Sequence, residues 1–130
     1  MADPYYLSLE QVLRIHASMV DVYGGATGVR DMGLLQSAVA MPQASYGGQA
    51  LHPTLFDQAA AYLYHLVQNH PFLDGNKRIG AASALVFLAM NGIQIEGDED
   101  GLVELTMAVA SGHLGKEAVA DWLANHRLQG

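Results

Sequence analysis

The twelve residues from Ile79 to Met90 form the most apolar run of the sequence, and this run constrains the fold most strongly. Gly80 and Ser83 interrupt it, and Asn91-Gly92 follows as a helix stop signal. At about 1.5 Å per residue, a helix of this length reaches roughly 18 Å, which is short of a hydrocarbon core of ~30 Å. We therefore expect a helix that is buried on all sides within the protein, and no membrane partner.

The rest of the sequence alternates helical apolar stripes with glycine and proline breaks. Residues 43–53 differ, because Gly47-Gly48 between two short arms predicts a small hairpin or flap. Ile93-Gln94-Ile95 predicts a short strand. Helices are expected from Ser8 to Gly24, from Asp31 to Met41, from Thr54 to Asn69, over residues 76–90, from Asp98 to Ser111 and over residues 116–127. Ser8 with Gln11, Asp31, and Thr54 with Asp57 are the expected caps at the starts of the first three. The pattern predicts an all-α bundle of five to six helices with a small β flap, in one domain spanning residues 1–130.

Charge and cysteine content exclude several classes of function. Thirteen Asp or Glu residues outnumber six Lys or Arg residues, which gives a formal charge of −7. This excess repels a phosphate backbone and argues against a nucleic-acid partner. The chain has no Cys, so disulfides, thiolate catalysis and Cys-based zinc sites are excluded, and a cytoplasmic location is expected. Against this acidic background, Lys77 and Arg78 are the only adjacent cations.

The segment from His70 to Arg78 joins two predicted helices and carries most of the candidate chemistry. The N-terminus of a helix exposes unpaired N–H groups that attract anions, and Gly75 lets a ligand approach the backbone closely. Asn76 can donate from its amide, while Lys77 and Arg78 add two positive charges, the arginine as a planar fork suited to phosphate oxygens. We therefore expect Gly75, Asn76, Lys77 and Arg78 to form a phosphate cradle.

Two more side chains of this segment, those of His70 and Asp74, are candidates for the chemistry at the phosphate cradle. Histidine ordinarily titrates near neutral pH, so His70 is suited to act as a general base. Asp74 offers a hard carboxylate, and one carboxylate beside phosphates is enough to hold Mg²⁺, because this ion keeps several waters. The combination favours phosphoryl or nucleotidyl transfer, with His70, Lys77 and Arg78 as catalytic residues and Asp74 as the metal ligand.

The order of these residues, His-x-Phe-x-Asp-Gly-Asn-Lys-Arg, resembles the signature of the Fic/Doc superfamily, His-x-Phe-x-[Asp/Glu]-Gly-Asn-Gly-Arg-x-x-Arg. The stretch from Gly28 to Ala38 resembles the N-terminal segment of the Doc (death-on-curing) branch, and the helix end at Met90-Asn91-Gly92 fits that branch too. Members of the family are compact all-α domains with a small β flap over the active loop. The resemblance implies the same architecture here.

Departures from the broad signature indicate the branch. Lys77 stands where AMP-transferring Fic proteins have Gly, and Ala81 stands where they have the second Arg, and Doc-like proteins share both changes. Ala82 and Gln68 stand where a polar Asn and a basic residue would be expected from the Doc archetype. In this branch ATP is understood to bind in reverse and to present its γ-phosphate. The resemblance therefore implies phosphorylation, with ATP and Mg²⁺, of a Thr or Ser hydroxyl, as the archetype does on elongation factor Tu to halt translation.

The resemblance also implies how such an enzyme is regulated. Many Fic enzymes carry an inhibitory helix with the pattern [Ser/Thr]-x-x-x-Glu-[Gly/Asn], and no Ser or Thr of this chain begins that pattern. The resemblance thus implies a toxin of a bacterial type II toxin–antitoxin system, inhibited in trans by an antitoxin whose C-terminal segment folds onto it. It also implies that the flap, Ala44 to Pro53, docks the acceptor backbone by strand addition.

Several alternatives stay open from the sequence. AMP or another nucleotidyl transfer is the main alternative reaction, a non-catalytic Fic-like binding module is an alternative of another class, and a His-Asp metal phosphohydrolase ranks last. Arg30 is interpreted as a loop cap or salt-bridge partner rather than a substrate contact. His65 and His70 lack a third ligand for zinc at useful spacing. His52, in the predicted flap, is a lesser candidate for substrate contact.

Overall fold

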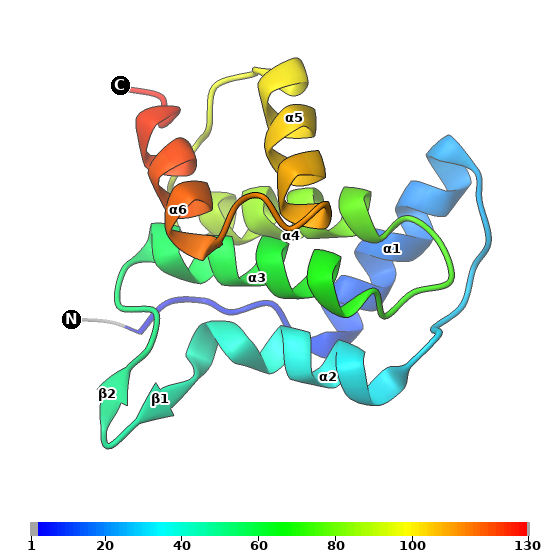
Figure 1. Cartoon of the computed structure of the whole chain (residues 1–130), viewed down its shortest axis with the longest axis horizontal. Coiled ribbons are helices and arrows are strands. Elements are labelled where there is room, and N and C mark those ends of the chain that lie inside the picture. The colour runs from blue at the N-terminus through cyan, green and yellow to red at the C-terminus, as the bar shows by residue number, and fades with distance from the viewer. Residues whose placement is uncertain (1–2, 130) are drawn as a thin grey trace.

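The computed structural model describes residues 3–129, and these form an all-α fold with six α-helices and one short hairpin (Figure 1). The elements are α1 (Leu9–Tyr23), α2 (Met32–Ala40), the 3₁₀ turn η1 (Met41–Gln43), β1 (Ser45–Tyr46), β2 (Gln49–Ala50), α3 (Leu55–Asn69), α4 (Asn76–Met90), α5 (Glu99–Ala110) and α6 (Lys116–Asn125). The predicted all-α fold with a small β flap is confirmed. Residues 1, 2 and 130 of the expected single domain lie outside the described residues.

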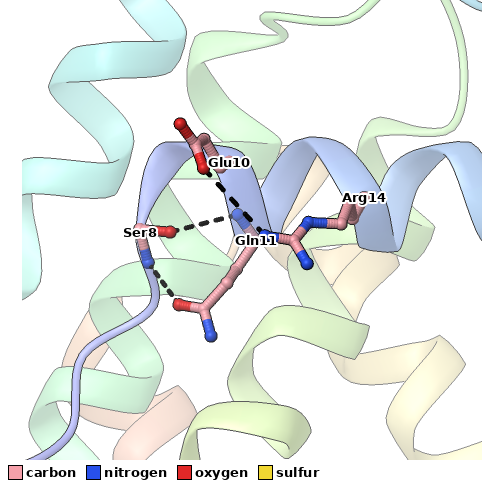
Figure 2. Close-up of polar contacts among 4 residues, drawn as sticks. All are labelled: Ser8, Glu10, Gln11 and Arg14. Atoms are coloured by element: carbon pink, nitrogen blue, oxygen red, sulfur yellow. Dashed lines mark hydrogen bonds and ion pairs between the residues drawn. The ribbon is translucent and has the colours of Figure 1, made fainter.

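The helix starts follow the caps expected from the sequence. The Ser8 hydroxyl accepts a hydrogen bond from the Gln11 N–H at 3.1 Å, and the Gln11 side chain accepts one from the Ser8 N–H at 2.8 Å (Figure 2). This reciprocal capping box satisfies two N–H groups that the helix itself leaves unpaired. Helices α2, α3 and α5 are also capped by a side chain, from Asp31, Thr54 and Asp98 respectively.

Helix α3 forms the centre of the core. It packs against α2 on one side and against α5 and α6 on the other, and α4 runs beside it (Figure 1). The contact with α4 is close because Gly80 has no side chain: a Cβ there would lie 2.8 Å from Val67 Cγ2 and 3.0 Å from the Leu63 carbonyl oxygen. The close contact brings the end of α3 and the start of α4 together around the loop that joins them.

The expectation that the Ile79–Met90 helix is buried on all sides is wrong. Ile79, Ala84 and Phe87 are buried, but Val86 is 37% exposed and Ala89 is also exposed. Helices α1, α3 and α5 contact α4 and leave one edge of it to solvent. Within residues 3–129, no helix combines the length and the apolar character that crossing a membrane requires.

The predicted strand at Ile93–Ile95 is reduced to a single bridge. Ile95 pairs with Arg127, and the Leu128 N–H donates to the Gln94 carbonyl oxygen at 2.9 Å. Among the described residues the two segments share only this bridge, which is too little to make a ladder. Helix α6 itself ends at Asn125, two residues before the expected end.

Candidate active site

An open pocket of about 620 Å³ lies where α3 ends and α4 begins. All six residues that the sequence singled out for chemistry line it: His70, Asp74, Gly75, Asn76, Lys77 and Arg78. Val67, Gln68, Leu73 and Ala110 complete its wall. The volume falls within the range of roughly 300–1,000 Å³ that small-molecule sites usually occupy.

The start of α4 is open toward this pocket. Gly75 occupies the N-cap position with φ 80° and ψ 20°, and no side chain caps the helix. The first N–H groups of α4 therefore lack the side-chain acceptor that Ser8 gives to α1. Lys77 and Arg78, in the first turn, are exposed. Unpaired N–H groups, the positive end of the helix dipole and two cations together make this end of α4 suited to an anion.

Arg78 is held in place by an aromatic ring from a distant part of the sequence. Its Cζ atom lies 4.5 Å from the ring centroid of Tyr23, the last residue of α1. A guanidinium stacked on a ring gains a modest cation–π attraction and loses rotamer freedom. The contact therefore orients the cation at the edge of the pocket before any ligand arrives.

The Asn76 side chain forms hydrogen bonds within the loop that precedes α4. It is buried, its Oδ1 accepts from the Phe72 N–H at 2.9 Å, and its Nδ2 donates to the Phe72 carbonyl oxygen at 3.0 Å. The amide that the sequence suggested for an anion thus closes the turn that precedes α4. What Asn76 offers a ligand is its main-chain N–H at the uncapped helix start.

Asp74 presents an exposed carboxylate at the pocket. Its Oδ1 accepts from the Gly75 N–H at 2.8 Å, and its Oδ2 lies 3.4 Å from the Ala26 nitrogen. Gly25 makes room for this arrangement, because a Cβ there would lie 2.5 Å from Oδ2. A carboxylate has about four acceptor positions, so capacity remains for a hard cation. Within residues 3–129 no three His, Asp or Glu side chains converge as metal ligands, so Mg²⁺ at Asp74 would need phosphate oxygens and water.

His16 supports the loop that precedes α4, and it was not among the site residues predicted from the sequence. Its ring stacks on Phe72 with centroids 3.8 Å apart, and its Nε2 lies 2.8 Å from the Asp74 carbonyl oxygen, which requires Nε2 to be the donor. The side chain is 4% exposed. One signal was available, because His16 follows the buried Val12 by four residues and so lies on the inward face of α1.

His70 ends α3 with φ 49° and ψ 53°, a left-handed conformation, and it is among the residues that line the pocket. The segment 28–31 runs beside the loop that follows it. Val29 forms a bridge with Phe72, and the Leu73 N–H donates to the Gly28 carbonyl oxygen at 3.1 Å. The Arg30 side chain binds carbonyl oxygens at the end of α3, which agrees with its interpretation as a loop cap.

A second polar cluster lies away from the pocket. Lys116 Nζ lies 3.0 Å from His52 Nε2 and 3.1 Å from His65 Nε2. Burial, and then the nearby Lys116 ammonium, lower the pKa of His65 to about 4 and shift the pKa of His52 in the same direction. Both rings are therefore neutral acceptors for the ammonium near pH 7. His52 is buried and faces the helices, and His65 contacts this lysine rather than His70.

The hairpin does not lie over the pocket, contrary to the expectation from the family resemblance. Ser45 pairs with Ala50 and Tyr46 with Gln49, as expected for a small flap. However, Figure 1 shows the hairpin near the N-terminal end of α3, whereas the 70–75 loop lies at the opposite end of that helix. No residue of the segment 44–53 is among those that line the pocket.

Comparison with known proteins gives concordant matches. A family model described as Fic/DOC family matches residues 6–88. A protein named Toxin Doc from Mycolicibacterium smegmatis (strain ATCC 700084 / mc(2)155) is 46% identical over 95 residues, which cover 73% of this chain and 71% of that protein. A protein named Protein kinase doc from Escherichia phage P1 is 34% identical over 125 residues, which cover 96% of each chain.

Proposed function

This chain belongs to the Fic/DOC family, and from that premise we propose that it is the toxin of a bacterial type II toxin–antitoxin pair. In this proposal it transfers the γ-phosphate of ATP, with Mg²⁺, to a Thr or Ser hydroxyl of a protein. The observation that carries the proposal is the pocket that brings a histidine, a carboxylate and an open helix start with two cations together.

In the proposed reaction His70 acts as the general base. Its imidazole takes the proton from the acceptor hydroxyl, the hydroxyl oxygen forms a bond to the γ-phosphorus, and the bond from that phosphorus to the β–γ bridging oxygen breaks. ADP leaves, and the proton stays on the imidazole until solvent takes it. Little covalent chemistry is asked of the protein, because phosphoryl transfer depends mainly on positioning and charge stabilisation.

The start of α4 supplies that charge stabilisation. The main-chain N–H groups of its first turn and the cations of Lys77 and Arg78 hold the phosphates, and Tyr23 keeps the Arg78 guanidinium in position. Asp74 is the residue that would hold Mg²⁺. When bound, this ion neutralises charge that develops on the transferring phosphate.

Two features favour phosphate transfer over AMP transfer. Lys77 occupies the position where AMP-transferring relatives have Gly, and Ala81 occupies the position of their second Arg. The phage P1 relative, which matches over nearly the whole chain, is named a protein kinase. By the resemblance, elongation factor Tu is the first acceptor to test, and an antitoxin acting in trans is the proposed inhibitor, in keeping with the name of the mycobacterial relative.

Label transfer separates the candidate functions. Purified protein is incubated with Mg²⁺, elongation factor Tu and ATP labelled in either the γ or the α position. We expect label from the γ position only, and a loss of about 10²–10⁴-fold for His70→Ala, the usual contribution of a general base. His113→Ala, at an exposed histidine outside the pocket, is the matched control.

Other outcomes would contradict the proposal in distinct ways. Label from the α position would establish nucleotidyl transfer instead. Equal growth arrest of bacteria by the native protein and by His70→Ala would favour a binding module without catalysis.

A further inference from the structure

His70 has a left-handed main-chain conformation, which few residues other than glycine adopt. Its φ of 49° is positive, and no other non-glycine residue among residues 3–129 has a positive φ. A side chain with a Cβ is strained in the left-handed region. The following Pro71 disfavours a right-handed helical conformation at His70, which explains why α3 ends there. It does not select the left-handed turn, which is a common helix ending but usually has Gly at this position. Contacts from another segment bind the main chain here.

Arg30 supplies those contacts with both its side chain and its main chain. Its Nε donates to the His70 carbonyl oxygen at 2.6 Å, and a terminal guanidinium nitrogen donates to the Asn69 carbonyl oxygen at 3.0 Å. The main-chain N–H groups of Arg30 and Asp31 donate to the Pro71 carbonyl oxygen at 2.7 and 3.1 Å. Three consecutive carbonyl groups are thus bound by one short segment.

The charge of Arg30 is directed at the helix end rather than at an acid. Within residues 3–129 the structure pairs its guanidinium with no carboxylate. The last carbonyl groups of a helix have no partner inside the helix and carry partial negative charge, so a cation there is favourable. Arg30 does not line the pocket, whereas His70 does. Any effect of Arg30 on the reaction therefore passes through the main-chain groups that it binds, at Asn69, His70 and Pro71.

We propose that Arg30 is a positioning residue for the reaction. By binding the carbonyl oxygens of Asn69 and His70, it holds His70 in the left-handed conformation in which this residue lines the pocket. This inference rests on the proposed function, in which His70 is the general base. It assigns to the segment 28–31 a part in catalysis, although no residue of that segment is among those that line the pocket.

The first test does not depend on activity. The three-bond HN–Hα coupling and the Cβ chemical shift of His70, measured by NMR, report its φ. We expect Arg30→Gln to change both, because the neutral side chain no longer holds the two carbonyl groups as the guanidinium does. Arg14→Gln is the matched control, since it removes the same charge from the exposed Arg14–Glu10 pair, whose nitrogen and oxygen are 4.0 Å apart (Figure 2). An unchanged His70 in Arg30→Gln would overturn the inference.

The second test measures the rate of phosphate transfer to elongation factor Tu. We expect Arg30→Gln to lower kcat by about 10- to 100-fold and to leave the KM for ATP within about twofold, because a displacement of ~1 Å at a reacting group can cost that much. Arg30→Lys keeps the charge and can bind one carbonyl group, so its kcat should lie between those of the native protein and Arg30→Gln. If Arg30→Gln does not fold, Arg30→Lys carries both tests, with smaller changes in the same direction.

The results distinguish this inference from the proposed function. If His70→Ala is inactive but Arg30→Gln and Arg30→Lys have native kcat, the inference fails and the proposed function stands. If the Arg30 variants raise the KM for ATP at unchanged kcat, Arg30 contacts the nucleotide and the inference also fails. If His70→Ala is fully active, the proposed function fails, and the NMR result alone decides whether Arg30 holds His70.

Discussion

The starts of α1 and α4 differ in what happens to the N–H groups that a helix leaves unpaired at its first turn. Ser8 and Gln11 close the start of α1 with a reciprocal pair of hydrogen bonds (Figure 2). At the start of α4, Gly75 provides no side chain at all, and Lys77 and Arg78 add positive charge where the helix dipole is already positive. The closed start serves the stability of the helix. The open start gives up that stabilisation and leaves donors and cations free for an anion.

A third helix shows that an open start is not sufficient for a site. Gly115 leaves α6 without a side-chain cap, and Lys116 lies in its first turn. There, however, the ammonium is occupied by two neutral rings, His52 and His65. Only at α4 do an open start, free cations, a carboxylate and a large pocket coincide among the described residues.

Among the substitutions that compare the helix starts, removal of a cation at the open start of α4 has the largest expected effect. Arg78→Ala removes both the guanidinium and its stack on Tyr23, and we expect kcat/KM for phosphate transfer to fall by about 10²–10³-fold. The free energy of unfolding should change by less than about 0.5 kcal/mol, since the side chain is exposed. Arg14→Ala beside the closed start of α1 is the control and should leave transfer unchanged. If kcat/KM falls equally in Arg78→Ala and Arg14→Ala, the cation at the start of α4 has no special part in transfer and the prediction is wrong.

A smaller effect is expected from the support beneath the open start. His16→Phe keeps a ring to stack on Phe72 but removes the hydrogen bond to the Asp74 carbonyl oxygen. We expect kcat to fall by about tenfold through misplacement of the loop, with the protein still folded. Steady-state kinetics with a thermal melt of the same sample measures both quantities. Native kcat in this variant would show that the loop holds its shape without His16.

Removing the closed start should affect stability and not activity. Ser8→Ala deletes the cap of α1, and we expect the free energy of unfolding to fall by about 1 kcal/mol, the usual cost of losing a serine N-cap. Urea denaturation measures the change, and the rate of phosphate transfer at 25 °C should equal that of the native protein. If Ser8→Ala is as stable as the native protein but slower in transfer, the start of α1 contributes to activity rather than to stability, contrary to this prediction.

A further effect on stability, comparable in size to the loss of the Ser8 cap, is a pH dependence at the occupied start of α6. The pKa of His65 is about 4 in the folded protein and 6.5 ordinarily, and burial is the main cause. Between these values the unfolded chain binds the extra proton, so stability is lost as the pH falls from about 6.5 to about 4. Partial exposure of the ring limits the loss to about 1–2 kcal/mol.

Urea denaturation at a series of pH values tests this dependence. The variant His65→Gln should flatten the curve between pH 6.5 and 4, whereas His113→Gln, at an exposed histidine, should not. A curve of native slope in His65→Gln would show that this ring does not titrate as the structure implies.

The sequence predicted those parts of the molecule that depend on neighbouring residues. Ser8, Asp31 and Thr54 cap helices where expected, because a cap involves residues only three positions apart. The residues of the candidate site were found together because they are contiguous, from His70 to Arg78. Their roles at that site stay predictions.

Contacts between distant segments could not be predicted in the same way. His16 meets Asp74 across 58 positions, and Arg30 meets His70 across 40. Such pairings depend on how the helices pack, which no local pattern encodes. The same limit explains the error at α4, since the exposure of Val86 depends on how many neighbours surround the helix.

A titration with ATP and Mg²⁺ followed by NMR tests the central claim most directly. One spectrum reports the main-chain amides at the open start of α4, residues 76–78, and those at the closed start of α1, residues 9–11. We predict large, saturable shifts at 76–78 and none at 9–11, with the response at 76–78 lost in Arg78→Ala. Saturable binding that moves other amides and leaves 76–78 unchanged would contradict the account.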